Sequence, residues 1–240
     1  MSAIPGDVDT DSQPPMTVPL RHFLVASAFL PFGVLLGMAA VADVRLGLLT
    51  LAHLHLLLVG WVCVTIAGAM TQFVPVWSGV ALHSTRLASL QLPLLAAGLL
   101  GFAGSLLAAR IALLPVFGAA ILLGFWLFVY NVGRTLARAR PFDTSERHFA
   151  LALGFFALAP ALGLLLAVDF SHPLFAGLPV TRPSVVAAHA TLAVFGAVLT
   201  TVLGALYQLG TMFTQTELHG VDHPLQRFEE AGYPLGVLLL

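Results

Sequence analysis

Six long runs of apolar residues constrain the fold of this chain more than any other feature of its sequence. The runs cover residues 22–42, 48–77, 87–109, 111–133, 148–168 and 185–213. Each is about 20 residues or longer, the length that an α-helix needs to cross the roughly 30 Å hydrocarbon core of a bilayer. Because lipid offers no partners to backbone amides, such runs cross a membrane as helices. The sequence therefore predicts an all-α membrane protein, a polytopic helix bundle.

The composition excludes several other classes of protein. Charged residues make up 9% of the chain and apolar residues 59%, whereas soluble domains carry about 25% charged residues. Ten arginines, eleven acidic residues and no lysine leave no basic surface for DNA or RNA. One cysteine, Cys63, excludes an intramolecular disulfide framework. We expect membrane lipid as the surrounding partner and no nucleic acid.

The two ends of the chain carry expectations of their own. Residues 1–20 are acidic and rich in Pro and Ser, which predicts a disordered tail; they lack the basic start of a signal peptide. A seventh apolar run opens at Tyr233 and stops at Leu240, too short to cross a bilayer. We therefore expect the sequence to be the N-terminal part of something longer, or to be truncated.

Arginine placement predicts the orientation, because loops rich in Lys and Arg stay in the cytoplasm. The loop 134–147 holds four arginines and is the most basic of the chain. With the N-terminus inside, seven arginines lie on the inner side and three on the outer side. We expect a multi-pass protein of a prokaryotic plasma membrane with its N-terminus inside.

The sequence contains an internal repeat. Segment 52–77 aligns with 188–213 without a gap, and nine of 26 positions are identical, among them His53/His189, Gly60/Gly196 and Gln72/Gln208. Upstream, Arg21-His22-Phe23 pairs with Arg147-His148-Phe149. This register predicts parallel four-helix repeats: residues 21–147, and residues 148–240 with the second unit truncated in its third helix.

The two repeated histidines are the main candidates for a cofactor site. On a regular helix, His53 shares a face with Gly60, and His189 shares the equivalent face with Gly196. A flat tetrapyrrole needs such a face, with an imidazole as axial ligand and small residues beneath it. His53 and His189 are therefore predicted metal ligands, with Gly60 and Gly196 beside the cofactor.

Simpler explanations exist for the same residues. Glycine and alanine let membrane helices pack closely, and a histidine can hydrogen-bond across them. Ionisable residues within spans are usually functional, however, and the recurrence in a second helix favours ligation. His55 lies about 200° around the helix from His53, so the two cannot bind one metal from one face. His53 is favoured over His55, His22 and His148 are interpreted as interfacial anchors, and Cys63 as a packing residue.

At the second helix the sequence resembles subunit I of the heme-copper oxidases, a family that includes cytochrome and quinol oxidases and nitric oxide reductases. The resemblance rests on Ala52-His53, Gly68-Ala69 and Gln72-Phe73-Val74-Pro75. It implies that His53 is an axial ligand of a b-type heme. His189 matches a copper ligand in the sixth helix of that family, so the resemblance also implies copper and an electron-donor subunit or cytochrome.

The resemblance covers about six of that family's twelve helices and leaves the activity open. The sixth helix of the family carries a Glu or Tyr near its histidine, which Ala190-Thr191-Leu192-Ala193 lacks. The resemblance implies a heme-binding redox protein, divergent or without oxygen-reducing activity. Val74-Pro75-Val76-Trp77-Ser78-Gly79 is also similar to NnrS-like heme- and copper-containing membrane proteins linked to nitric oxide.

Two further alternatives involve no cofactor. A membrane carrier or channel would use the Thr, Gln and His side chains to line a polar path. A structural subunit would use its histidines only for hydrogen bonds between helices. The oligomeric state and the reaction, if any, do not follow from the sequence.

Overall fold

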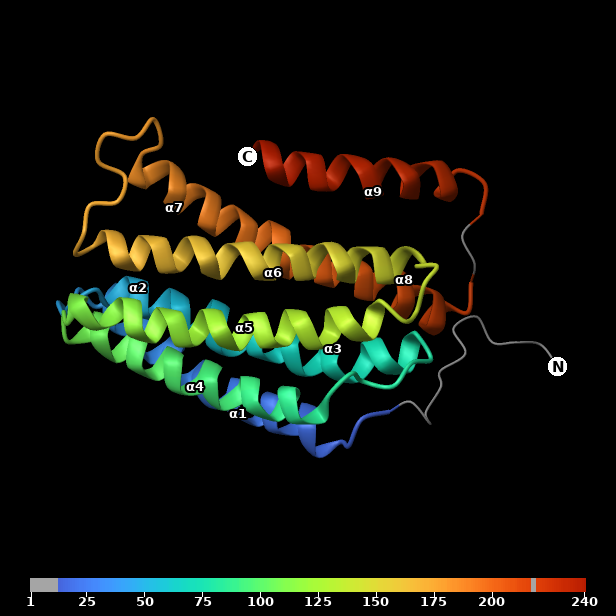
Figure 1. Cartoon of the computed structure of the whole chain (residues 1–240), viewed down its shortest axis with the longest axis horizontal. Coiled ribbons are helices and arrows are strands. Elements are labelled where there is room, and N and C mark those ends of the chain that lie inside the picture. Colours follow the sequence, from blue (N-terminus) through green and yellow to red (C-terminus); the bar gives the residue numbers. More distant parts are fainter. Residues whose placement is uncertain (1–12, 217–218) are drawn as a thin grey trace.

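The structure is a computed structural model of the whole chain, and it describes residues 13–216 and 219–240 (Figure 1). The predicted disordered tail lies outside the described residues over positions 1–12; the first helix begins at Thr17, inside the predicted tail. The helices are α1 (Thr17–Val41), α2 (Leu49–His55), α3 (Val64–Trp77), α4 (Thr85–Leu107), α5 (Leu114–Leu136), α6 (Thr144–Asp169), α7 (Arg182–Thr191), α8 (Thr200–Thr214) and α9 (Asp222–Leu239).

Two of the long helices are composites with a π-helical centre. The π-helical segment η2 (Leu56–Cys63) joins α2 to α3, and η4 (Leu192–Leu199) joins α7 to α8. A short 3₁₀ turn, η3 (Ile111–Leu113), leads into α5. π-Helical segments are rare and are often found at functional sites.

Six helices are long and apolar enough to cross a membrane, and they confirm the six predicted runs. They span Thr17–Val41, Leu49–Trp77, Thr85–Leu107, Ile111–Leu136, Thr144–Asp169 and Arg182–Thr214. No strand occurs in the described part of the chain. The prediction of an all-α polytopic bundle is therefore confirmed.

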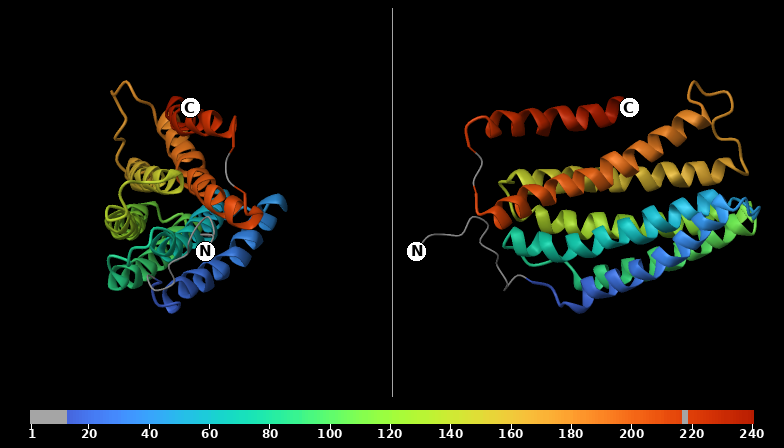
Figure 2. Two further views of the ribbon diagram at one scale, coloured as in Figure 1. Left: turned by 90° about the vertical axis from the view of Figure 1, so that its right-hand side faces the viewer. Right: turned by 180° about the vertical axis from the view of Figure 1, so that it is seen from behind.

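Consecutive membrane spans run in opposite directions, which gives the bundle two distinct ends (Figure 1). Loops 42–48 and 170–181 lie at one end, here called the α2 end, and loops 78–84 and 137–143 at the other, the α4 end. Figure 2 shows α1 and α9 at opposite edges of the bundle.

The repeat seen in the sequence recurs in the packing. A methyl group on Gly68 would lie 2.6 Å from His22 Cβ, and one on Gly204 would lie 2.8 Å from His148 Cβ. The helix α1 therefore packs on its composite partner α2–η2–α3 as α6 packs on α7–η4–α8. Both π-helical segments also begin three residues after the repeated histidine, at His53 and at His189.

The last helix begins earlier than the sequence predicted. The apolar run opens at Tyr233, but α9 starts at Asp222. Its first turns are polar and are held by polar contacts, such as the bond from Arg147 to Glu230, so hydropathy did not reveal them. In the second repeat unit α9 is the counterpart of α4. Gln91 of α4 contacts His22, and Glu229 of α9 contacts His148 in the same way.

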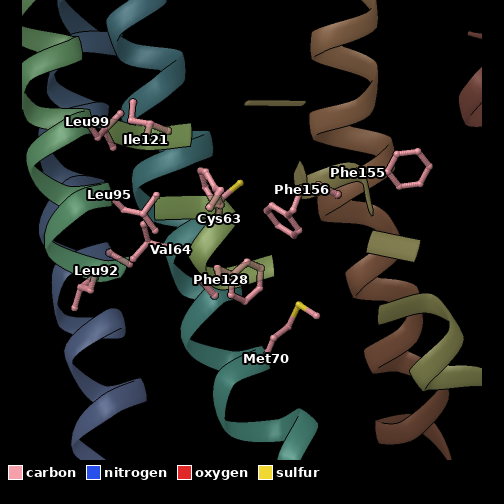
Figure 3. Close-up of a cluster of buried hydrophobic side chains, with 14 of the residues drawn as sticks. Cys63, Val64, Met70, Leu92, Leu95, Leu99, Ile121, Phe128, Phe155 and Phe156 are labelled. Atoms are coloured by element: carbon pink, nitrogen blue, oxygen red, sulfur yellow. The ribbon is translucent and has the colours of Figure 1, made fainter. Parts of the chain in front are cut away.

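The apolar core lies between the first composite helix, α4, α5 and α6 (Figure 3). Val64, Leu95 and Phe128 are almost completely buried there. Phe156 of α6 packs edge-on against Phe128, with ring centroids 5.5 Å apart. This core joins the two repeat units and positions the side chains of the cavity described next.

Candidate functional site

Three histidines gather at the α2 end of the bundle, and each is oriented by a backbone carbonyl. His53 Nδ1 donates to Gly33 O and His189 Nδ1 donates to Ala159 O, both at 2.8 Å. His55 Nδ1 donates to Leu51 O, also at 2.8 Å. In a neutral imidazole only one ring nitrogen carries a proton, so these bonds leave Nε2 as the lone-pair nitrogen. Each histidine is thus prepared to act as a ligand.

His53 and His189 occupy equivalent positions in the two repeat units. Their rings lie against the preceding helix at Gly37 and at Gly163. A methyl group on Gly37 would lie 2.6 Å from His53 Cε1, and one on Gly163 would lie 2.9 Å from His189 Cε1. Only glycine leaves room for each ring to reach its carbonyl.

His55 lies opposite His189, although the sequence favoured His53 over His55. The ring centroids of His55 and His189 are 6.5 Å apart and their planes are 18° from parallel. His53 instead points toward α1, where it meets Gly33 and Gly37. The expectation that His53 and His55 cannot share one metal agrees with these different directions.

A cavity of about 250 Å³ lies between the two composite helices and contains His55 and His189. Along each composite helix the lining residues recur at every fourth position. One series is His55, Val59 and Cys63, and the other is His189, Ala193 and Ala197.

The remaining cavity walls are apolar and come from α4, α5 and α6. They include Phe102, Phe125, Phe156 and the small residues Gly118, Ala159 and Gly163. The cavity opens to the outside of the bundle where Leu54, Leu58 and Val186 are exposed. An apolar cavity of this kind has few partners to offer water and favours apolar occupants.

The predicted glycines Gly60 and Gly196 lie away from this cavity. A methyl group on Gly60 would lie 2.7 Å from Phe29 Cγ, and one on Gly196 would lie 2.6 Å from Phe155 Cγ. Both glycines are buried and serve close helix packing in this structure.

Sequence reasoning missed Gly37 and Gly163, the glycines that contact the histidine rings. The signal was present, because the register of Arg21-His22-Phe23 with Arg147-His148-Phe149 continues along the helix. Extended by fourteen residues from Phe23 and Phe149, it pairs Gly37 with Gly163. The repeat thus contained the cradle glycines as well as the histidines.

A second polar cluster lies at the α4 end. His148 Nε2 lies 3.1 Å from both carboxylate oxygens of Glu229, and Tyr207 Oη donates to Glu229 Oε2 at 3.2 Å. His22, in the first repeat unit, contacts Gln91 Nε2 at 3.1 Å. His22 and His148 are buried and bonded to neighbouring helices, so the interpretation of both as interfacial anchors is wrong.

Comparison with known proteins assigns no family to this chain. No protein-family model matches this chain, and no curated protein matches its sequence. Within residues 13–216 and 219–240, no three His, Cys, Asp or Glu side chains gather closely enough to hold a metal ion. The His55–His189 pair brings one candidate ligand from each repeat unit together, with ring centroids 6.5 Å apart.

Proposed function

We propose that this chain is a heme-binding integral membrane redox protein, similar to subunit I of the heme-copper oxidases. The observation that carries the proposal is the repeated arrangement of histidine, carbonyl and glycine. His53 and His189 are each tied through Nδ1 to the preceding helix and leave Nε2 free. A ligating histidine almost always donates its other N–H to such a partner, which fixes its ring.

Position within the membrane spans supports a functional role for these side chains. Ionisable residues are costly in spans and usually mark functional sites. A histidine needed only for helix packing could be replaced by an apolar residue at no such cost. The chain keeps one at the same register of both repeat units, beside a glycine that makes room for it.

The residues around the cavity fit a heme in their chemistry. Neutral imidazole is a common axial ligand of heme iron, and apolar walls tune the potential of the iron. Small residues at Ala193 and Ala197 would let a flat ring approach the helix backbone. The enclosed volume, about 250 Å³, is below the roughly 300–1000 Å³ of ordinary ligand sites. The ring would therefore also occupy the open side at Leu54 and Leu58.

A bound heme would supply one-electron chemistry, with the iron alternating between the ferrous and ferric states. The protein itself would hold the ring, orient the imidazoles and exclude water. The electron would come from a donor subunit or a cytochrome. Copper is the alternative metal for His189, as in the oxidases and in NnrS-like proteins.

This cavity does not suit the solute path of a cofactor-free carrier. A polar path for a solute needs side chains that hydrogen-bond along its length, whereas this cavity is lined almost entirely by Leu, Val, Ala, Phe and Gly. The histidines are its main polar groups.

Absorption spectra of the purified full-length chain test the proposal. Expressed in cells with ample heme synthesis, the protein should show an α band typical of b-type cytochromes in reduced-minus-oxidised spectra. His172 lies exposed in the loop 170–181, so His172→Ala should keep the band and serves as the control. A folded, colourless and metal-free preparation would contradict the proposal.

A further inference from the structure

We infer that His55 and His189 are the two axial ligands of one heme iron held between the two repeat units. This inference rests on the proposed function and goes beyond it, because the resemblance points to His53 and not to His55. The ring centroids of His55 and His189 lie 6.5 Å apart, too far for van der Waals contact between stacked rings.

The separation matches what a shared metal requires. A nitrogen ligand lies about 2.0 Å from its metal and about 1.1 Å from the centre of its own ring. Two imidazoles that bind one ion from opposite sides therefore have centroids about 6 Å apart. The observed centroid distance of 6.5 Å is close to that value.

The donor atoms are also free on both rings. His55 Nδ1 bonds to Leu51 O and His189 Nδ1 bonds to Ala159 O. Each Nε2 is left with its lone pair, and both side chains line the same cavity. Neither ring must give up a hydrogen bond to take a metal.

The cavity has small residues beside His189 and an aromatic residue beside His55, an arrangement that suits a flat ring. Below His189 the helix presents Ala193 and Ala197, and across from it α6 presents Gly163. Phe102 approaches the His55 ring, with centroids 5.0 Å apart, and would pack against the edge or face of a macrocycle. His53 is not among the residues that line this cavity.

This arrangement has a consequence for chemistry. Two imidazoles and four ring nitrogens fill all six positions of the iron, so no position is left for oxygen, carbon monoxide or nitric oxide. A heme held in this way would transfer electrons and would not reduce gases. Because one ligand would come from each repeat unit, such a heme would also link the two units.

Three histidine variants of the full-length chain test the inference by spectroscopy. The wild-type protein should give the electron paramagnetic resonance spectrum of low-spin ferric heme and should not bind carbon monoxide when reduced. His55→Ala and His189→Ala should each lose the low-spin signal, with either heme loss or a five-coordinate iron that binds carbon monoxide. His53→Ala should keep the low-spin spectrum.

Two controls keep folding separate from ligation. Added imidazole should restore the low-spin signal in His55→Ala, which a merely misfolded variant would not allow. His55→Asn keeps a polar side chain of similar size, and it should fold like the wild type by circular dichroism while losing the signal.

The possible outcomes separate the inference from the proposed function. Loss of the low-spin signal in His53→Ala, together with its retention in His55→Ala, would overturn the inference and leave a heme protein. A folded wild-type chain without heme would overturn the proposed function. Copper without heme would overturn both the proposed function and this inference, even if metal analysis showed that His55→Ala loses the copper.

Discussion

His148 Nε2 lies 3.1 Å from both carboxylate oxygens of Glu229, and this contact requires a shared proton. The other ring nitrogen, Nδ1, already donates to Thr144 O at 2.8 Å. A neutral ring would then offer a lone pair to a carboxylate, which repels it. A proton must therefore lie on Nε2 or on the acid. In the first repeat unit His22 Nε2 instead accepts from the amide of Gln91, and no proton is needed.

This difference predicts that Glu229→Gln is tolerated and that Glu229→Ala is not. Glutamine gives His148 the amide partner that His22 already has, so α9 should stay attached. Alanine leaves His148 and Tyr207 without their shared acceptor, at a cost of about 1–3 kcal/mol. Hydrogen exchange across 222–239 measures the difference. Equal protection in both variants would show that the carboxylate does not hold α9.

Acidification should release a second contact of α9, the ion pair between Arg147 Nη2 and Glu230 Oε1 at 2.9 Å. Burial raises the pKa of Glu230, but hydrogen bonds from Gln226 and Arg147 outweigh burial, and the net pKa is lowered. A lowered pKa in the folded state means that the pair stabilises the protein above the ordinary pKa of Glu. That stabilisation is lost as the pH falls through the folded-state value.

The size of this acid effect should be small. Arg147 is half exposed, so the pair should contribute less than about 1 kcal/mol. Thermal unfolding of the wild type and of Glu230→Gln, compared from about pH 7 to pH 3, gives the measurement. The two melting temperatures should converge at low pH. A constant difference across that range would contradict the assignment.

The membrane spans were predictable from the sequence, because a run of about 20 apolar residues has few other stable folds. What packs against the face behind each histidine was not. Sequence reasoning placed Gly60 on the same helix face as His53, and both do face α1, where Gly60 meets Phe29 and His53 meets Gly37. That face is covered by the preceding helix, and the cavity lies instead beside His55, Val59 and Cys63.

Long-range polar contacts were equally beyond the sequence. Asn131 is fully buried, and its side chain bonds both the N–H and the carbonyl of Ser84 at 2.9 Å. Nothing in the pattern around Asn131 indicates a partner 47 residues away. The pairing of His55 with His189 has the same origin, since it depends on how two repeat units meet and not on either unit alone.

Gly163, which contacts the ring of His189, and Gly154 in the same helix give a matched pair of variants. A methyl group at Gly163 would come within 2.9 Å of His189 Cε1, so Gly163→Ala should displace the ring from Ala159 O. Loss of such a supporting contact weakens metal binding about 10- to 100-fold. Gly154→Ala in the same helix meets nothing within 4 Å and should bind heme normally. Titration of the heme-free protein with hemin measures both affinities.

The reverse expectation holds for Gly37, which contacts His53. A methyl group there would lie 2.6 Å from His53 Cε1. If the iron is held by His55 and His189, Gly37→Ala should alter stability but leave hemin affinity close to that of the wild type. A loss of affinity as large as that of Gly163→Ala would instead point to His53 as a ligand.

Cys63 is the single cysteine of the chain and offers a direct report on the cavity. It is 7% exposed and lines the same cavity as His55 and His189. A maleimide should reach it only when the cavity is empty and the bundle opens locally. With hemin at about ten times its Kd, labelling should slow about tenfold. His55→Ala should lose this protection, and denatured protein should label completely in every case. Equal labelling rates with and without hemin would show that the occupant does not enter this cavity.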